Sequence, residues 1–484
     1  MNDIKRREKI LTGNLFTAVL MICMPLALYQ LLNSFYNLFD QVICAQISTT
    51  AQNAVSSISQ IKLTISAFGG GLAAGGGVIV SRYFGAGRIK DARHSGSNLL
   101  LLSLLLSAIV LGIFIPLAYP IMSLAQIAPE SIEIGINFFR LQMVELIFIT
   151  INSVYIGLLK AKGNSKIILY LNLASMIVKL GLTSLFILGI KLNDITFVEL
   201  ANIVAQLFIT VVGSILMFSK NNLIRLSLKM FKLKKIYVLP ILKLSIPIFL
   251  GKFVMNLGKV IVNAICGYYW NTVTDGLIVG TLGVSNNISG LINSPTNSFE
   301  EGTSSIVSQN IGNGNLKRAL MAFVHSFLIS LVISIVGYLL LRFVLIEDIV
   351  KLFTSADNKS DTYKQMVVEI FKYDSLSILS LGINATVLGL LYGFGQTGLS
   401  TILNLSRIGS RIIFLVSIHS IMPDLAPTTC AGLSMAISNA TILLLSLIFL
   451  MIFLIRVHKH GYKGLRFGDN NTGIKELDLD KNIE

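Results

Sequence analysis

The sequence predicts an all-α integral membrane protein, with about twelve transmembrane helices in two parallel-repeat six-helix bundles around a central cleft. Of its 484 residues, 54% are hydrophobic and only 13% are charged, and the charged share is about half of that in soluble globular domains. Apolar runs close to the roughly 20 residues that span a bilayer recur along the whole chain. Two motifs far apart in the chain match each other, which indicates an internal repeat.

The apolar runs give the expected helices in order. The first run lacks a small-residue cleavage site and many runs follow it, so it is expected to be a first span and no signal peptide. The expected spans are 15–46, 54–80, 97–119, 134–158, 167–189, 197–219, 240–269, 276–309, 320–345, 367–393, 399–421 and 428–455. They divide the chain into an N-terminal lobe (1–219), a cytoplasmic basic linker (220–239), a C-terminal lobe (240–455) and a cytoplasmic tail (456–484).

Lysine and arginine residues gather in alternate loops. They lie before the first span, after the second, fourth and eighth spans, in the linker and in the tail, whereas 120–133 has none. By the positive-inside rule both termini are expected to be cytoplasmic. These loops account for the net charge of +15, and no basic domain is large enough to bind DNA or RNA, so no nucleic-acid partner is expected.

The repeat is carried by two glycine-containing motifs. SRYFGAGRIKDA at 81–92 resembles SQNIGNGNLKRA at 308–319, and Met24-Pro25 recurs as Ile246-Pro247. Each glycine motif closes the second span of a six-span unit. Because both units start on the cytoplasmic side, the repeat is parallel, as in many transporters whose substrate site lies between the halves.

The glycine clusters have structural interpretations. GAG at 85–87 and GNG at 312–314 are expected to form tight cytoplasmic turns with positive φ. GGGLAAGGG at 69–77 lacks the Lys-Ser/Thr ending of a phosphate loop, so close helix packing is expected there. Without a nucleotide signature, an ion gradient and not ATP is expected to drive transport.

The cysteines and acids show none of the spacings that are typical of an enzyme. The four cysteines show no paired or metal-ligand spacing, so free thiols are expected. We find no paired catalytic acids, metal cluster or nucleophile–base arrangement. The chain is therefore expected to be no enzyme and to have no metal and no cofactor apart from H⁺ or Na⁺ as a coupling ion.

Asp40 is an acid inside the first apolar run. On a helix it shares one stripe with Tyr29, Asn33, Tyr36 and Asn37, because residues three and four apart share a face. An ionised carboxylate facing lipid is costly, so Asp40 is expected to face protein or a wet cavity. We interpret Asp40 as the carrier of the coupling proton or cation. The alternative is a structural acid satisfied by neighbouring Asn, Tyr or lysine side chains.

Polar stripes continue on the other spans. Lys179 and Thr183 share a stripe in span five, and a lysine in mid-span requires a partner, for which Asp40 and Glu145 are available. The expected coupling group is Asp40, Lys179, Thr183, Asn33, Asn37 and Tyr36. The expected substrate cleft is lined by Glu145, Asn152, Asn202, Gln206, Asn256, Lys259, Asn263, Asn293, Asn297, Glu300 and Glu301.

Other charges are expected nearer the membrane surfaces. Lys62 and Lys252 can snorkel towards a surface, although Lys252 and Lys259 in span seven also match two glutamates in span eight as compensating pairs. Asp374 is expected to be solvated at the outer end of span ten. Arg407 and Arg411 are expected in the cytoplasmic headgroup region, with the inward mouth as the alternative, and 347–366 is expected to be an external loop.

Over about residues 10–455 the chain resembles the multidrug and toxic compound extrusion (MATE) transporters, within the larger group that includes lipid-linked oligosaccharide flippases. The motifs, in their order, are Pro25, YNLFD (36–40), SRYFGAG (81–87), LLKAKGNSK (158–166) and SPTNSFEEGTSSIVSQNIGNGN (294–315). The resemblance implies a bacterial inner-membrane antiporter, expected to be a monomer among membrane lipids. It would rock between inward-open and outward-open states and export a small organic substrate.

The resemblance also implies site residues. In one branch of the family an aspartate on the first helix responds to the cation, and Asp40 matches it. That branch has an Asn and an Asp on the fifth helix, where this chain has Lys179 and Thr183. Another branch has an acid on the seventh helix, where this chain has Asn256, and an Asp on the tenth, with no match near Leu381. An ammonium beside Asp40 would compete with Na⁺, and the lysines favour an anionic or zwitterionic substrate.

Three functions remain open. The leading hypothesis is a proton-coupled exporter in which Asp40 makes and breaks a pair with Lys179. The second is a lipid-linked precursor flippase whose lysines hold a diphosphate. The third is a non-transporting membrane protein with a degenerate cation site.

Overall fold

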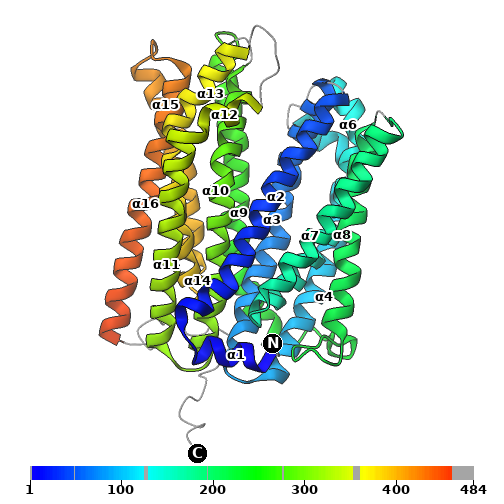
Figure 1. Ribbon diagram of the computed structural model, residues 1–484, viewed down its shortest axis with the longest axis vertical. Helices are drawn as coiled ribbons and strands as arrows, with labels where there is room; N and C mark the ends of the chain where they lie inside the picture. Colours follow the sequence, from blue (N-terminus) through cyan, green and yellow to red (C-terminus); the bar gives the residue numbers. More distant parts are fainter. Residues whose placement is uncertain are drawn as a thin grey trace, which may run out of the picture.

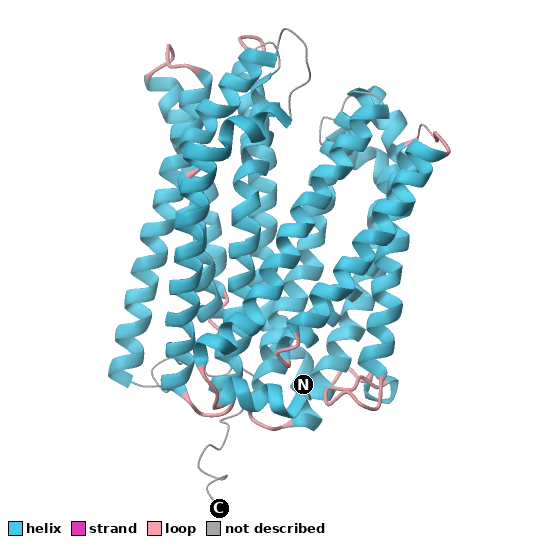
Figure 2. Ribbon diagram, in the orientation of Figure 1, coloured by secondary structure: helices cyan, strands magenta, loops and turns pink. Residues whose placement is uncertain are grey.

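The computed structural model confirms the all-α prediction. It describes residues 3–47, 49–124, 129–192, 194–274, 277–352 and 360–460, and within these the side chains of 36–53 and of a few further residues are outside the described set. The backbone of this part of the chain is helical almost throughout and contains no strand (Figure 2).

The long helices match the order of the apolar runs. In the first half the helices are α1 (Asp3–Leu11), α2 (Leu15–Ile47), α3 (Thr49–Gly85), α4 (Ile89–Phe114), α5 (Ala118–Leu124), α6 (Pro129–Ala161), α7 (Ser165–Ser184) and α8 (Ile195–Phe218). In the second half they are α9 (Lys235–Trp270), α10 (Leu277–Gly312), α11 (Leu316–Leu339), α12 (Ile346–Leu352), α13 (Ser360–Asp374), α14 (Leu376–Gly393), α15 (Gly398–Ile421) and α16 (Pro427–His460). Short π-helical turns extend α7 and α11.

Eleven helical stretches in the described part of the chain are long and apolar enough to cross a membrane. Helix α10 is not among them, although it is 36 residues long, because it is rich in Ser, Thr and Asn. Most of its C-terminal half is buried, so protein and not lipid satisfies these polar side chains. With α10 the count of long helices agrees with the expected twelve spans, and the chain is a multi-pass membrane protein.

The segment 347–366 was expected to be an external loop, and its described ends are helical instead. Residues 346–352 form α12 and 360–366 begin α13. In α13 the buried residues Val367, Ile370 and Phe371 recur at helical spacing and bind the helix to the bundle. The tenth span is thus made of two helices, α13 and α14, that meet at Ser375.

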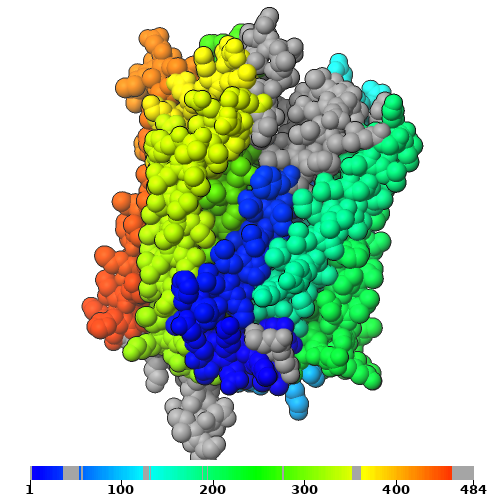
Figure 3. Space-filling model, viewed as in Figure 1, coloured from blue at the N-terminus to red at the C-terminus, as the bar shows by residue number. Residues whose placement is uncertain are grey.

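The helices form two groups, α2–α8 and α9–α16, that meet at the end where α1 lies and diverge towards the other end (Figure 1). We call them the N-bundle and the C-bundle. On the face shown in Figure 3, α2 lies between α7 of the N-bundle and α11 of the C-bundle. The largest apolar core draws on both bundles, with Ile79 and Leu158 in one and Ile306 and Leu388 in the other.

Four turns at the end near the termini share one conformation. Their glycines, Gly87, Gly163, Gly314 and Gly395, have φ of 74°, 72°, 75° and 81°, the left-handed region that glycine adopts without strain. In each turn the glycine N–H donates to the carbonyl three residues back, and the next N–H donates to the carbonyl five back, at 2.8–3.1 Å. These are the two bonds of a Schellman motif. The prediction of positive φ in the two glycine motifs is confirmed.

The repeated motifs touch each other reciprocally. A Cβ on Gly85 would collide with the Gln309 carbonyl, and a Cβ on Gly312 would collide with the Arg82 carbonyl. Gly85 and Gly312, like Arg82 and Gln309, are equivalent positions of the repeat. The ends of α3 and α10 therefore pack backbone to backbone across a pseudo-two-fold axis.

Helix α1, which the sequence analysis did not anticipate, ties both bundles together at this end. Arg7 Nη2 donates to the Gly85 carbonyl at 2.9 Å, and Arg318 of α11 donates to the Ile10 carbonyl at 3.0 Å. Asp3 lies 3.3 Å from Lys162. Burial lowers the pKa of Lys162, and the charge of Asp3 opposes that shift.

Gly312→Ala is expected to destabilise the protein by about 1–3 kcal/mol, because the added methyl must displace backbone. The control is Gly112→Ala in α4, where a Cβ meets no atom within 4 Å, and there alanine in a helix interior is expected to be neutral or to add up to about 1 kcal/mol. Thermal unfolding of the purified protein in detergent measures both. Equal melting temperatures would contradict the close approach.

Candidate functional site

The bundles are joined near the termini by polar contacts between α3 and α6 on one side and α10 and α14 on the other. Lys160 Nζ lies 2.5 Å from Glu301 Oε2. The Lys160 carbonyl accepts from Ser305 Oγ at 2.8 Å, and the Ala161 carbonyl accepts from Gln309 Nε2 at 2.9 Å. Arg82 Nη2 donates to the Gly393 carbonyl at 2.8 Å. We call this set the inner seam.

A second ion pair lies beside the inner seam. Lys252 Nζ is 3.8 Å from Glu300 Oε1, and their side chains are 33% and 13% exposed. Glu300, Glu301, Lys160 and Tyr392 line a cavity of about 20 Å³, enough for one or two waters. The expected pairing of span-seven lysines with span-eight glutamates is confirmed for Lys252, whose partner Glu300 lies on the neighbouring helix of the C-bundle.

Contacts between the bundles extend from the inner seam along α3 and α9. Phe68 and Phe249 stack with ring centroids 4.0 Å apart. Asn256 Nδ2 donates to the Leu63 carbonyl at 2.9 Å, and among the described residues this is the hydrogen bond between bundles that lies farthest from the termini. The next residues outward on these helices include Lys62 of α3 and Lys259 of α9.

Lys62 belongs to a charge cluster inside the N-bundle. Its ammonium contacts the Glu145 carboxylate and lies 3.6 Å from Glu199 Oε1. Asn202 Nδ2 donates to Glu199 Oε2 at 3.1 Å. Glu145 and Glu199 are 3% and 0% exposed. The expectation that Lys62 snorkels to a surface is wrong, because two buried carboxylates hold it in the bundle.

Glu199 was missed in the sequence analysis. It lies in the first turns of α8, just after Asp194, whose side chain caps that helix, and an acid there resembles a solvated helix start. The available signal was its spacing of three and seven residues to Asn202 and Gln206, which places all three on one stripe.

The other polar residues of the N-bundle bind one another. Asn152 Nδ2 donates to Gln206 Oε1 at 2.9 Å, and Thr210 Oγ1 donates to Asn152 Oδ1 at 2.9 Å. The side chains of Lys179 and Thr183 are both fully buried, and Lys179 has an interaction partner. Asn33 is half-buried on α2.

Three residues of the expected coupling group cannot be placed. Tyr36, Asn37 and Asp40 lie on α2, but their side chains are outside the described residues. The interpretation of Asp40 therefore stays a prediction.

The C-bundle contains a cluster of cations. Arg407 donates from Nη2 and Nε to Asn439 Oδ1 at 2.9 and 3.2 Å, and Arg411 Nε donates to Ser438 Oγ at 3.1 Å. The two arginines are 8% and 5% exposed. The expected headgroup position of both arginines is wrong, because α15 turns them inward against α16.

One acid accompanies these cations. Asp374 is 2% exposed and accepts from Ser285 Oγ at 3.3 Å, so its expected solvation is wrong. It lies at the end of α13, inside the membrane-spanning part of the bundle. The prediction failed because the apolar run is interrupted at this point, which resembles the end of a span in the sequence. Lys259, which is exposed, interacts electrostatically with Asp374 and with both arginines. We call Lys259, Asp374, Arg407 and Arg411 the C-bundle cluster.

The remaining expected cleft residues are spread along α9 and α10. Asn263 is half-buried and Asn297 is exposed. Asn293 is buried and donates to Ser377 Oγ at 3.2 Å. Of the expected cleft residues, Glu301 thus belongs to the inner seam with Glu300 beside it, Glu145 and Asn202 belong to the charge cluster around Lys62, and Lys259 belongs to the C-bundle cluster.

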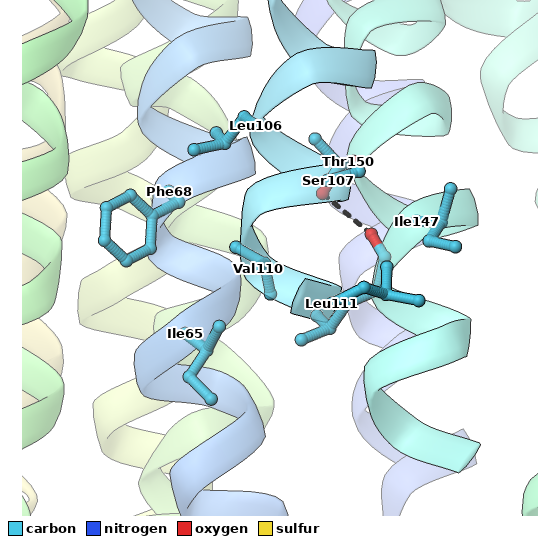
Figure 4. A pocket seen from close by; sticks show the side chains of 9 residues that line it. Ile65, Phe68, Leu106, Ser107, Val110, Leu111, Ile147 and Thr150 are labelled. Carbon is cyan, nitrogen blue, oxygen red and sulfur yellow. Dashed lines mark hydrogen bonds between the residues drawn. The ribbon is translucent and has the colours of Figure 1, made fainter. Parts of the chain in front are cut away.

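A second small cavity is not a chemical site. It holds about 10 Å³ inside the N-bundle, between α3, α4 and α6, and its lining includes Ile65, Phe68, Val110 and Thr150 (Figure 4). Thr150 Oγ1 is already bonded to the Leu146 carbonyl at 2.7 Å. Among the described residues, no three His, Cys, Asp or Glu side chains are grouped to hold a metal ion.

Known proteins resemble this chain over most of its length. The family model MatE matches residues 25–185 and 247–416. The multidrug export protein MepA of Staphylococcus haemolyticus (strain JCSC1435) is 23% identical over 441 residues, which cover 88% of this chain and 93% of that protein.

Two solved structures show the same fold. One is a MOP superfamily transporter from Pyrococcus furiosus for which a binding pocket of reverse polarity is described, and the other is a multidrug resistance MATE family transporter in an outward-facing conformation. Each is 17% identical, has a TM-score of 0.85, and matches 93% of this chain and 98% of the other.

Lys62→Met is expected to destabilise the protein by about 3–5 kcal/mol, because it leaves two buried carboxylates without their cation. Lys252→Met, which removes a lysine that is one-third exposed, is expected to cost about 1 kcal/mol or less. Adding Glu199→Gln to Lys62→Met should recover part of the loss, since one buried charge is removed. Thermal unfolding compares the three variants, and a Lys62→Met protein as stable as Lys252→Met would contradict the cluster.

Proposed function

The chain belongs to the MatE family, and on that premise we propose that it is a secondary active exporter. It moves small organic compounds out of the cell in exchange for H⁺ or Na⁺ by alternating access. The multidrug export protein MepA, which it resembles over most of its length, supports the substrate class of small organic compounds.

The observation that carries this proposal is that, in the part of the chain that the structure describes, the contacts between the bundles run from the inner seam as far as Asn256 and Leu63. The inner seam joins the bundles at the end where α1 lies, while the bundles diverge towards the opposite end (Figure 1). A transporter that alternates access needs a closure that can open on one side while the other side closes. The reversible polar contacts of the inner seam fit that role.

We propose that the seam faces the cytoplasm of a bacterial cell and that this conformation is open outward. The support is charge, because Arg7, Arg88, Lys160, Lys162 and Arg318 all lie at the seam end. The positive-inside rule assigns such an end to the cytoplasm. Both termini would then be cytoplasmic.

We propose H⁺ as the coupling ion and Asp40 as its carrier. The support is a lysine on α7, a helix that packs against α2. Lys179 is fully buried, and an ammonium in the N-bundle takes the place of a bound Na⁺, which needs several oxygen ligands, whereas a proton needs one carboxylate oxygen. Asp40 would hold a proton in one state and release it in the other.

Asp40→Asn is expected to abolish substrate-driven proton movement and to leave the protein folded, because the amide cannot take up or release a proton in this pH range. The measurement is the pH inside proteoliposomes after addition of candidate cationic and anionic substrates, with thermal unfolding as the folding check. Asp361→Asn, at a side chain that is 86% exposed on α13, is the matched control. Normal proton movement by Asp40→Asn would remove Asp40 from this role.

Glu301→Gln is expected to open the inner seam, because it leaves the Lys160 ammonium without its charged partner; a charge-assisted bond of this kind contributes about 1.5–3 kcal/mol. Spin labels on Lys90→Cys and Lys317→Cys, two exposed equivalent positions beside the seam, report the separation in a variant whose native cysteines are replaced by alanine. The long-distance population should grow.

The exposed Glu347→Gln on α12 should leave the label distances unchanged. Unchanged distances in Glu301→Gln would show that the ion pair does not hold the seam closed.

A further inference from the structure

The C-bundle cluster has more positive than negative charge. Lys259, Arg407 and Arg411 face one carboxylate, Asp374, and these four groups interact electrostatically with one another. Among the described residues no ion pair involves either arginine or Lys259. Two positive charges therefore lack a compensating negative charge inside a membrane protein, where uncompensated charge is costly.

The neighbouring side chains orient the arginines without neutralising them. Arg407 is held by the amide oxygen of Asn439, and Arg411 by the hydroxyl of Ser438. The nearest further acid on α13, Glu369, is bonded to Thr428 and Thr429 at 2.6 and 2.8 Å. The acids of the inner seam, Glu300 and Glu301, are bound to Lys252 and Lys160.

A buried hydrogen-bond donor beside the C-bundle cluster has no acceptor in the part of the chain that the structure describes. Asn439 is 1% exposed, and its Oδ1 accepts two bonds from Arg407. Its Nδ2 donor has no hydrogen-bond partner among the described residues. The Nη1 of Arg407 faces only the Met255 sulfur, at 3.9 Å, a weak acceptor. Buried donors without acceptors are costly, and an incoming acceptor would satisfy them.

The exposed member of the cluster, Lys259, lies on the face of α9 that contacts the other bundle. Asn256, one turn before Lys259 on α9, is bonded to Leu63 of the opposite bundle, so this face of α9 faces the N-bundle. Lys259 is exposed just beyond that bond, where the bundles diverge. Met255 of the same turn contacts Arg407. Lys259 is therefore the exposed cation on the helix face that also carries the contact to the buried Arg407.

We propose that Lys259, Arg407 and Arg411 bind an anionic oxyacid group, such as a carboxylate, of a small organic substrate. The substrate's negative charge replaces the missing counter-ion, and its oxygens accept from the guanidiniums and from Asn439. That the bound compound is exported rests on the proposed function, whereas the binding of an anion at this place does not.

The test is a pair of fluorescent probes that differ only in charge, coumarin-3-carboxylate and coumarin-3-carboxamide. Anisotropy titrations use the purified full-length protein in an uncharged detergent. The carboxylate is expected to bind about tenfold or more tightly than the amide, as for a charge-assisted hydrogen bond in place of a neutral one. Equal affinities, or no binding of the carboxylate, overturn the site.

Variants separate a binding role from a structural one. Arg411→Gln should weaken carboxylate binding about tenfold and leave the amide unaffected, Arg411→Lys should retain part of the preference, and Asp374→Asn should tighten carboxylate binding because it removes the competing negative charge. The control is Arg225→Gln, which removes an exposed arginine of the linker and should change neither affinity. A purely structural cluster would lose affinity for both probes in both Arg411→Gln and Asp374→Asn, and that result overturns the proposal.

Failure of the export function gives a different result. Proteoliposomes loaded with each probe measure its release under a proton gradient. Charge-selective binding without release would retain the anion site and reject export of these compounds, whereas release of both probes with equal affinity would retain export and reject the site.

Discussion

The constraint behind this structure is the cost of charge in a medium without water. Lysines inside the bundles meet carboxylates on other helices: Lys62 on α3 meets Glu145 and Glu199 on α6 and α8, and Lys160 on α6 meets Glu301 on α10. Pairs within a bundle fix its helices, and pairs between bundles hold the two together. The C-bundle cluster departs from this pattern, because its cations outnumber its acid, and departures of this kind mark functional positions.

Helix order and turn chemistry could be read from the sequence, because hydropathy and glycine spacing are local signals. The positive φ of Gly87 and Gly314 followed from the repeated motifs. The partner of a charge could not be read, since spacing gives the face of a helix but not the helix it faces. Lys62 was therefore placed at a surface, and Glu199 was overlooked. Asp374 was misplaced because the break between α13 and α14 reads as the end of a span.

The two clusters beyond the inner seam have opposite charge balance. In the N-bundle two carboxylates surround Lys62, whereas in the C-bundle three cations surround Asp374. They lie on either side of the point where Asn256 and Leu63 join the bundles. The same point of contact between the bundles therefore has an excess of negative charge on its N-bundle side and an excess of positive charge on its C-bundle side.

The reciprocal approach of Gly85 and Gly312 gives the contact between the two halves the symmetry of a contact between identical subunits. Gly85 approaches Gln309, and Gly312 approaches Arg82, the repeat equivalent of Gln309; contacts between identical subunits related by a two-fold axis follow the same rule. Each half thus presents a self-complementary surface at the seam. The two halves of one polypeptide therefore meet at this point as the two subunits of a symmetric dimer do, so a side chain added to either glycine would disturb the same contact.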